Sequence, residues 1–242
     1  MSISKKIKFI ALLSVCPATG FADKGVGIQG LSGGVSLGAS FWSLTRNEKV
    51  GKDSGTDVPI FEGISSRKTG FAGYGVFGYG DFFADSDFFW GASLWLGYAS
   101  GTNKQEKEIA GSYHVVSSVK RSFTVKGLFK VGKAFESVAP YALFGFYGQS
   151  CKLDHETKDL VDDKVYGETS NYFLPGIAAG VGATIPLTEK MFLDVSYQFN
   201  YGFSHTEKYA LKDGSISIEG KKNYAHAVLL GAGWSFGGGG KG

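Results

Sequence analysis

Hydrophobic and polar residues alternate with a period of two in several segments of the chain. From Phe88 to Tyr98, one face reads Phe, Trp, Ala, Leu, Leu, Tyr, and the other carries Phe, Gly, Ser, Trp and Gly. From Leu193 to Phe203, one face is Leu, Val, Tyr, Phe, Tyr, Phe, and the other is Asp, Ser, Gln, Asn and Gly. Alternation of this kind predicts β-strands whose two faces meet different surroundings.

The same reading along the whole chain predicts eight strands of about ten residues, the length that a tilted membrane-spanning strand needs. No segment beyond the first 22 residues approaches the run of about 18 apolar residues that a spanning helix requires. The eight expected strands cover 35–45, 71–79, 88–98, 119–131, 141–149, 177–185, 193–203 and 224–236.

The connections between these strands alternate in length. Short turns are expected at 81–87, 134–139 and 186–190, and long polar loops at 46–68, 101–114, 151–170 and 205–222. Outer-membrane barrels have short turns at one rim and long loops at the other. We therefore predict an all-β fold, an eight-stranded antiparallel up-and-down transmembrane β-barrel. A water-soluble, lipocalin-type barrel with an aromatic core is the alternative for the same strands.

The two faces of the strands predict two sets of residues with different surroundings. Aromatic residues near both ends of the apolar faces are typical of the two membrane interfaces, and this expected girdle comprises Phe88, Tyr98, Tyr141, Tyr147, Tyr201, Tyr224, Trp234 and Phe236. An eight-stranded barrel is just wide enough inside for side chains, and buried charges need partners. We expect an interior polar network of Lys120, Lys126, Lys130, Asp194, Gln198 and Asn200.

The N-terminus has the pattern of a secretory signal. Three lysines precede a short apolar run at 9–15, and Gly20 and Ala22 have the small-residue spacing of a cleavage site. We predict export through the periplasm and cleavage after Ala22. This divides the chain into a signal peptide at 1–22 and a barrel domain at 23–242, with a short Gly-rich tail at 237–242.

Composition adds two constraints. The 37 glycines, 20 phenylalanines and 12 tyrosines suit crowded, curved strands. The formal net charge of +3 is carried by the three lysines of the signal, so the mature chain is balanced and a nucleic-acid partner is not expected. Of the two cysteines, only Cys151 follows the cleavage site. We expect it to be a free thiol, open to reagents at the start of a long loop.

Four short motifs, PYALFG at 140–145, GVGA at 180–183, LDVSY at 193–197 and WSF at 234–236, carry a family resemblance. The chain resembles the eight-stranded outer-membrane barrels of the OmpA membrane-domain, OmpX and opacity-protein type. Members of that family end on an aromatic residue, whereas residues 237–242 follow Phe236 here.

The resemblance implies a non-enzymatic surface protein, or surface antigen, of a Gram-negative outer membrane. The barrel would be the anchor, and the long extracellular loops would be the surface for interaction or adhesion. Expected partners are outer-membrane lipid, lipopolysaccharide and an extracellular or host ligand of the loops, and the expected state is a monomer.

Other functions use different residues. A narrow porin-like channel for small solutes or ions is the main alternative. Ser204, His205 and Glu207 can be drawn as a triad, although strand neighbours point to opposite faces. The third long loop offers oxygen ligands for a hard cation, without the spacing of an EF-hand, in Asp154, His155, Glu156, Asp159, Asp162 and Asp163. We expect no catalytic residue, no cofactor and no metal.

Overall fold

The computed structural model describes residues 28–52, 57–109, 113–159, 163, 165–211 and 214–236. The expected signal peptide at 1–22 and Gly-rich tail at 237–242 lie outside these residues. Within the described ranges, no helix has the length and apolar character needed to cross a membrane.

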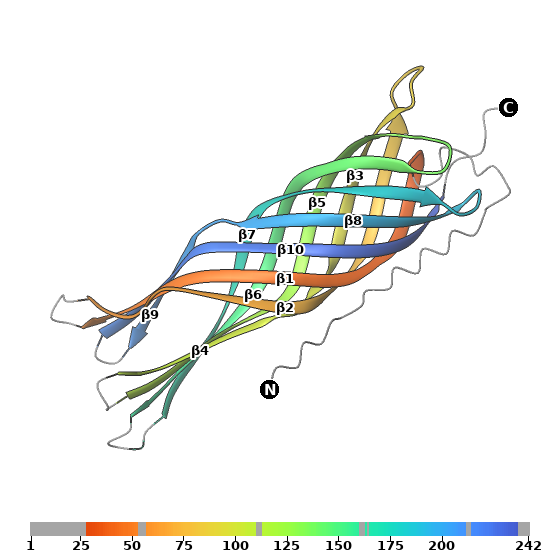
Figure 1. Cartoon of the computed structure of the whole chain (residues 1–242). Coiled ribbons are helices and arrows are strands. Elements are labelled where there is room, and N and C mark those ends of the chain that lie inside the picture. The colour runs from red at the N-terminus through yellow and green to blue at the C-terminus, as the bar shows by residue number, and fades with distance from the viewer. Residues whose placement is uncertain are drawn as a thin grey trace, which may run out of the picture.

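One antiparallel sheet closes on itself into a barrel (Figure 1). Eight strands follow one another around it in the order β1-β2-β3-β5-β6-β7-β8-β10, and β1 also pairs with β10. Beyond the end of β3, β4 pairs with β5, and beyond the end of β8, β9 pairs with β10. This confirms the predicted eight-stranded antiparallel barrel. The strands are β1 (Gly30–Lys52), β2 (Asp57–Phe82), β3 (Phe88–Ala99), β4 (Thr102–Ile109), β5 (Tyr113–Lys133), β6 (Ala139–Asp159), β7 (Val165–Pro186), β8 (Met191–Gly202), β9 (His205–Leu211) and β10 (Gly214–Ser235).

The three short turns lie where the sequence predicts them, between β2 and β3, between β5 and β6, and between β7 and β8. In the first turn, Asp85 has a φ of 53°, a left-handed conformation that Asp tolerates in turns. The N–H of Ser86 donates a 3.2 Å hydrogen bond to the carbonyl of Phe83. These turns define one rim of the barrel, here called the turn end.

The long polar connections differ from the prediction, because most of their residues continue the strands as β-hairpins. β9, β10, β1 and β2 pair into one extended arm, and β4, β5, β6 and β7 pair into another. Figure 1 shows both arms reaching beyond the barrel at the end opposite the turns, here called the hairpin end. In these extensions both faces of each strand are polar, so the alternation of apolar and polar residues stops. Backbone pairing continues there, because a strand surrounded by water does not need an apolar outer face.

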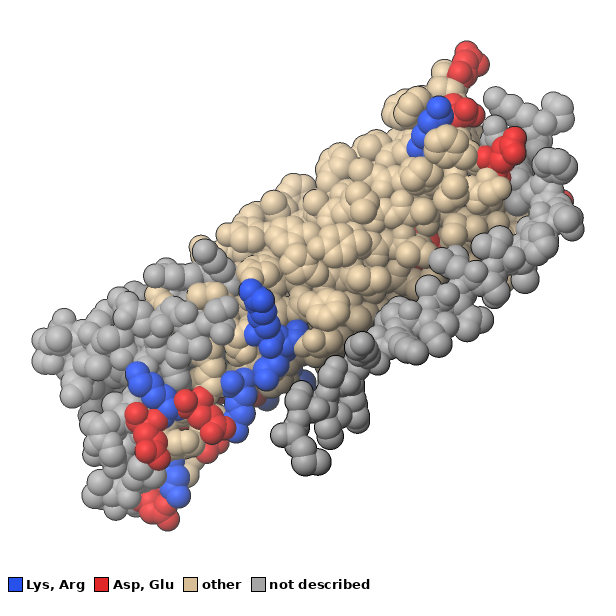
Figure 2. Space-filling model, viewed as in Figure 1, with Lys and Arg blue, Asp and Glu red and all other residues tan. Residues whose placement is uncertain are grey.

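The outer wall between the two ends is apolar. Figure 2 shows a broad band without charged side chains, with lysine and arginine gathered where the band meets the hairpins. Val181 is 59% exposed and Leu230 is 58% exposed within this wall. Contiguous apolar surface on this scale is not typical of a wall that faces water.

Candidate functional site: the barrel interior

Lys126 of β5 lies in the interior of the barrel. Its Nζ donates a 2.6 Å hydrogen bond to Oε1 of Gln198, which reaches it from β8 on the far wall. The same Nζ lies 4.5 Å from the ring centroid of Tyr74 and 5.9 Å from that of Trp95. All four side chains are buried. An amide oxygen and two aromatic faces therefore stabilise this cation.

A second cation, Arg121, lies in the interior nearer the hairpin end. Its Nε donates to Oε1 of Gln149 at 3.1 Å, and one terminal nitrogen donates to Oγ of Ser40 at 3.2 Å. The guanidinium carbon lies 5.3 Å from the ring centroid of Trp42, whose indole N–H donates to Asn223 at 2.6 Å. The sequence reading placed Arg121 on the outward face and so missed this cluster.

Lys120 is exposed on the outer wall, which corrects its expected place in the interior. The register between β5 and β6 shifts between Arg121 and Thr124. Val119 and Arg121 are therefore buried on the hairpin side of the shift, and Thr124 and Lys126 are buried on its other side. A bulge reverses the alternation of faces, so one period-two pattern drawn through 119–131 assigns Lys120 to the wrong face.

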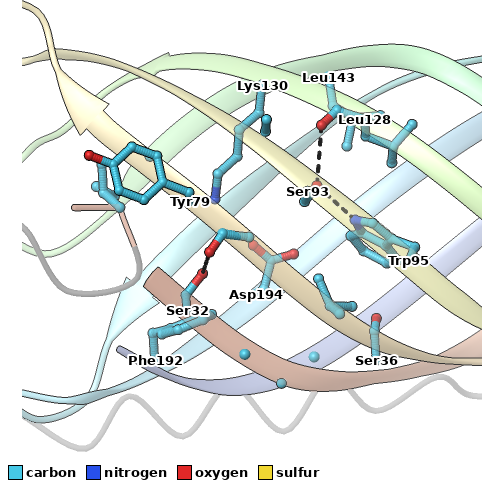
Figure 3. Close-up of a pocket in the computed structure, with 18 of the residues that line it drawn as sticks. Ser32, Ser36, Tyr79, Ser93, Trp95, Leu128, Lys130, Leu143, Phe192 and Asp194 are labelled. Atoms are coloured by element: carbon cyan, nitrogen blue, oxygen red, sulfur yellow. Dashed lines mark hydrogen bonds between the residues drawn. The ribbon is translucent and has the colours of Figure 1, made fainter. Parts of the chain in front are cut away.

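Asp194 organises the interior near the turn end. Its carboxylate accepts a 2.7 Å hydrogen bond from the Tyr141 hydroxyl and a 3.1 Å bond from Thr184. Lys130 and Asp194 line the same cavity of about 60 Å³, as Figure 3 shows. Such a volume has room for a few water molecules. Lys130 Nζ also lies 5.2 Å from the ring centroid of Tyr141.

Tyr141 and Tyr147 belong to this interior, which corrects their expected place in the outer girdle. They are 6% and 7% exposed. In the register with β7, Tyr141 lies opposite Gly182 and Tyr147 lies opposite Gly176. A Cβ at Gly182 would lie 2.5 Å from the Tyr141 hydroxyl, so the glycine makes room for the inward ring. An aromatic residue facing a glycine was the signal that the sequence reading missed.

The six other girdle residues stand on the outer wall. Tyr224 is half-buried beside Phe199, with ring centroids 6.3 Å apart. The rest are exposed: Phe88, Tyr98, Tyr201, Trp234 and Phe236.

The interior residues form separate clusters. Lys126 and Gln198 pair with each other, whereas Lys130 and Asp194 share the cavity near the turn end. Asn200 is buried, and its Oδ1 has no hydrogen-bond partner among the described residues. With the Arg121 cluster, the interior therefore combines three polar centres with a large apolar and aromatic core that includes Phe89, Leu128, Leu143 and Leu229.

Cys151 is a free thiol within β6, buried at 1% exposure. It packs with Trp42, Val119 and Leu153 in the hairpin half of the interior. The expectation of an open thiol at the start of a loop is therefore wrong, because β6 continues past this position.

The acidic residues of the third hairpin are held by neighbours in the hairpin itself. Asp154 accepts hydrogen bonds from Thr169 at 2.7 Å and from Lys152 at 3.0 Å, and the Thr169 hydroxyl is the main cause of the lowered pKa of Asp154. Asp163 pairs with Lys158 at 2.7 Å. His155 is buried and Glu156 is exposed; Asp159 and Asp162 lie outside the described side chains.

The drawn triad does not lie on one strand, because His205 and Glu207 belong to β9 and Ser204 precedes it. Ser204 is exposed in the break between β8 and β9, and the side chains of His205 and Glu207 lie outside the described ones. Among the side chains that the structure describes, no group of three or more forms a metal-binding cluster.

Comparison with known proteins identifies the fold of this chain through solved structures. No family model and no curated protein matches the sequence. The structure of the outer membrane protein OprG from Pseudomonas aeruginosa matches with a TM-score of 0.52 at 11% identity, over 86% of this chain and 98% of that one. Ail, the attachment invasion locus protein of Yersinia pestis, matches at 0.34 and 14% identity, over 86% and 99%. The Escherichia coli outer membrane protease OmpT matches at 0.41 and 12% identity, over 85% and 96%. The likeness to OprG and the closed eight-stranded sheet identify the fold of this chain as that of the small outer-membrane β-barrels.

Proposed function

We propose that this chain is a non-enzymatic surface protein of a Gram-negative outer membrane. The barrel is a membrane anchor, and the four hairpins are a surface for an extracellular ligand. The observation that carries the proposal is a barrel that is apolar outside and filled inside.

The outer wall supports insertion into a bilayer. Val181 and Leu230 are among many large apolar side chains exposed between the turn end and the hairpin end. Exposed Phe88 and Trp234 lie near one edge of this wall, and Tyr98 and Tyr201 lie near the other. An apolar band flanked by aromatic girdles is the exterior that a bilayer requires of a transmembrane barrel.

The filled interior favours an anchor over a porin-like channel. Lys126 and Gln198 bond across the barrel, and Tyr74 and Trp95 pack on the cation. Eight-stranded barrels are narrow enough for side chains to fill. A path for solutes would have to break this hydrogen bond and displace buried rings.

The hairpins support a binding surface for a ligand of the cell exterior. Their exposed faces carry paired charges, such as Lys104 with Glu106 at 2.5 Å and Lys158 with Asp163. Strand pairing holds Lys104, Glu106 and Lys158 on a backbone that extends well beyond the apolar wall (Figures 1 and 2). Binding residues commonly lie on connecting segments that a rigid scaffold supports.

Single-channel recording in planar bilayers tests this function. The refolded chain is expected to insert without discrete conductance steps, whereas a porin in the same apparatus serves as the positive control. Reproducible steps from the wild-type chain, altered in size by Lys126→Glu, would assign a channel instead.

A further inference from the structure

The two residues before β1 fold into the mouth of the barrel at the turn end. Ile28 and Gln29 precede the first ladder pair, Gly30 with Gly80, so neither residue belongs to the sheet. The side chain of Ile28 is nevertheless only 3% exposed and packs in the apolar core that includes Phe89. An isoleucine outside the sheet is therefore enclosed by the strands of the barrel.

Two glycines make room for this path of the chain. Gly30 has a φ of 78°, a left-handed conformation that glycine adopts without strain, and the chain turns here between Gln29 and β1. A Cβ at Gly80 would lie 2.4 Å from the carbonyl oxygen of Ile28, so the missing side chain leaves space for the backbone of the segment. Gly30 and Gly80 lie opposite each other on β1 and β2, and both conditions are therefore met at one place on the rim.

Behind Ile28 lies the polar cavity of about 60 Å³ that contains Lys130 and Asp194, here called the chamber (Figure 3). Ile28 lines the chamber at the turn end, and Trp95 lines it as well. The ring centroid of Trp95 lies 5.9 Å from Nζ of Lys126, which bonds across the barrel further from the turn end. The chamber thus lies between the Ile28 side chain on the turn side and the cross-barrel bond of Lys126 on the hairpin side.

The attachment of Ile28 is light compared with that of a strand residue. Gln29 Nε2 donates a 3.3 Å hydrogen bond to Oδ1 of Asp81 at the exposed rim. Besides this bond, the hold on the segment is the apolar contact of one isoleucine side chain. Segments with few backbone hydrogen bonds and few apolar contacts open at a much lower free energy than the whole fold. Such a segment can leave the mouth while the sheet stays intact.

From these observations we propose that Ile28 is a stopper that closes the chamber at the turn end, and that its release opens the chamber to small polar solutes from that side only. Lys130 and Asp194 then meet the solution at the turn end, while the cross-barrel bond of Lys126 keeps the hairpin side closed. Two barriers in series admit a solute to a blind chamber without making the barrel a pore. The stopper acts inside the barrel, so it does not depend on the proposed anchor function.

Alkylation of a cysteine in the chamber by iodoacetamide tests the stopper. Ser36 lines the chamber and is buried. Ser40 is buried on the same face of β1, nearer the hairpin end, where it accepts a hydrogen bond from Arg121. Ser36→Cys and Ser40→Cys, each made in a Cys151→Ser background and refolded in detergent micelles, report the two sides of the cross-barrel bond. Mass spectrometry measures both alkylation rates.

Ile28→Gly is expected to accelerate alkylation of Ser36→Cys at least tenfold and to change the rate of Ser40→Cys less than twofold. The matched control, Leu31→Gly, removes a side chain of the same size from the exposed outer wall and is expected to leave both rates within twofold. Gln29→Ala removes the hydrogen bond at the rim and is expected to raise the rate of Ser36→Cys about threefold.

An unchanged rate of Ser36→Cys in the Ile28→Gly variant would overturn the stopper. Equal acceleration of both cysteines would overturn it too, because the whole barrel would then be loosened. Ile28→Ala, a smaller truncation, is expected to give an intermediate rate and carries the same test if Ile28→Gly does not fold.

Planar-bilayer recording separates the stopper from the function proposed above. The Ile28→Gly variant is expected to show no conductance steps, because the bond of Lys126 still crosses the barrel. Steps in the wild type would overturn the anchor function, whereas steps that appear only in Ile28→Gly would overturn the blind chamber.

Discussion

Lys126 and Gln198 are 72 positions apart in the chain, yet their side chains meet in a 2.6 Å hydrogen bond inside the barrel. The bond joins β5 to β8, which do not pair with each other in the sheet. It therefore braces two separate parts of the wall, and it places a cation and its acceptor where water is scarce. Hydrogen bonds to charged groups are the stronger ones, and a partner left alone in such a place is costly.

The first prediction concerns this pair. Gln198→Met should destabilise the barrel by about 1.5–3 kcal/mol, because the buried ammonium loses its acceptor. Lys126→Met should cost about 1–3 kcal/mol, because the amide of Gln198 loses its donor. The double variant should cost clearly less than the sum. Urea midpoints of unfolding from lipid vesicles measure all three, with exposed Lys120→Met as a control expected within about 0.5 kcal/mol. Strict additivity would show that the bond contributes nothing.

Two glycines of neighbouring strands are predicted to respond in opposite ways to alanine. A Cβ at Gly145 would lie 2.0 Å from the carbonyl oxygen of Gly127, whereas a Cβ at Gly127 would meet nothing within 4 Å. Gly145→Ala should therefore force the β5–β6 pairing apart and cost about 1–3 kcal/mol. Gly127→Ala should stay within about 0.5 kcal/mol. The same vesicle unfolding assay compares them, and equal effects would contradict the described pairing of β5 with β6.

Cys151 is predicted to resist thiol reagents in the folded barrel. Its side chain is buried among Trp42, Val119 and Leu153. A membrane-impermeant maleimide added to intact cells should leave it unlabelled, and the same reagent in denaturant should label it fully. The accessible control is a cysteine at the exposed neighbouring position, Lys152→Cys, in a Cys151→Ser background. Rapid labelling of Cys151 in the folded protein would show that β6 ends before this residue.

The orientation of the barrel gives a fourth prediction. An epitope inserted at 160–162, between β6 and β7, should be bound by antibody on intact cells. The same epitope inserted at 135–137, in the turn between β5 and β6, should be bound only after the outer membrane is permeabilised. The reverse pattern would place the hairpins in the periplasm and invert the proposed orientation.

The sequence predicts the strands and the short turns because both depend on local pattern. Alternation marks Phe88–Tyr98 without knowledge of any partner strand, and the turn at 81–87 separates two such patterns. The hairpin extensions carry no apolar alternation, so their pairing depends on strands that only the closed sheet brings together. The bulge between Arg121 and Thr124 is equally invisible locally, and it alone moves Lys120 to the outer wall.

The interior contacts depend on register and on distance in the chain. Tyr141 turns inward because Gly182 lies opposite it and because Asp194 accepts a hydrogen bond from its hydroxyl. Gly182 and Asp194 belong to other strands than Tyr141. Lys126, Gln198 and Asp194 face inward as alternation predicts. The sequence does not show which of these side chains pair with one another. It also does not show that aromatic rings, rather than carboxylates, surround Lys126, because the closed barrel brings those rings together.

The most direct test of the membrane barrel compares one substitution at two equally exposed apolar positions. Leu230 of β10 and Val165 of β7 are each 58% exposed, but Leu230 lies in the apolar wall and Val165 lies on a hairpin beyond it. A lysine near the bilayer midplane costs about 2–4 kcal/mol, and one in water costs little. In urea unfolding from vesicles, Leu230→Lys should therefore lower stability by about 2–4 kcal/mol and Val165→Lys by no more than about 0.5 kcal/mol. Equal and small effects at both positions would mean that the outer wall faces water, and the chain would be a soluble barrel.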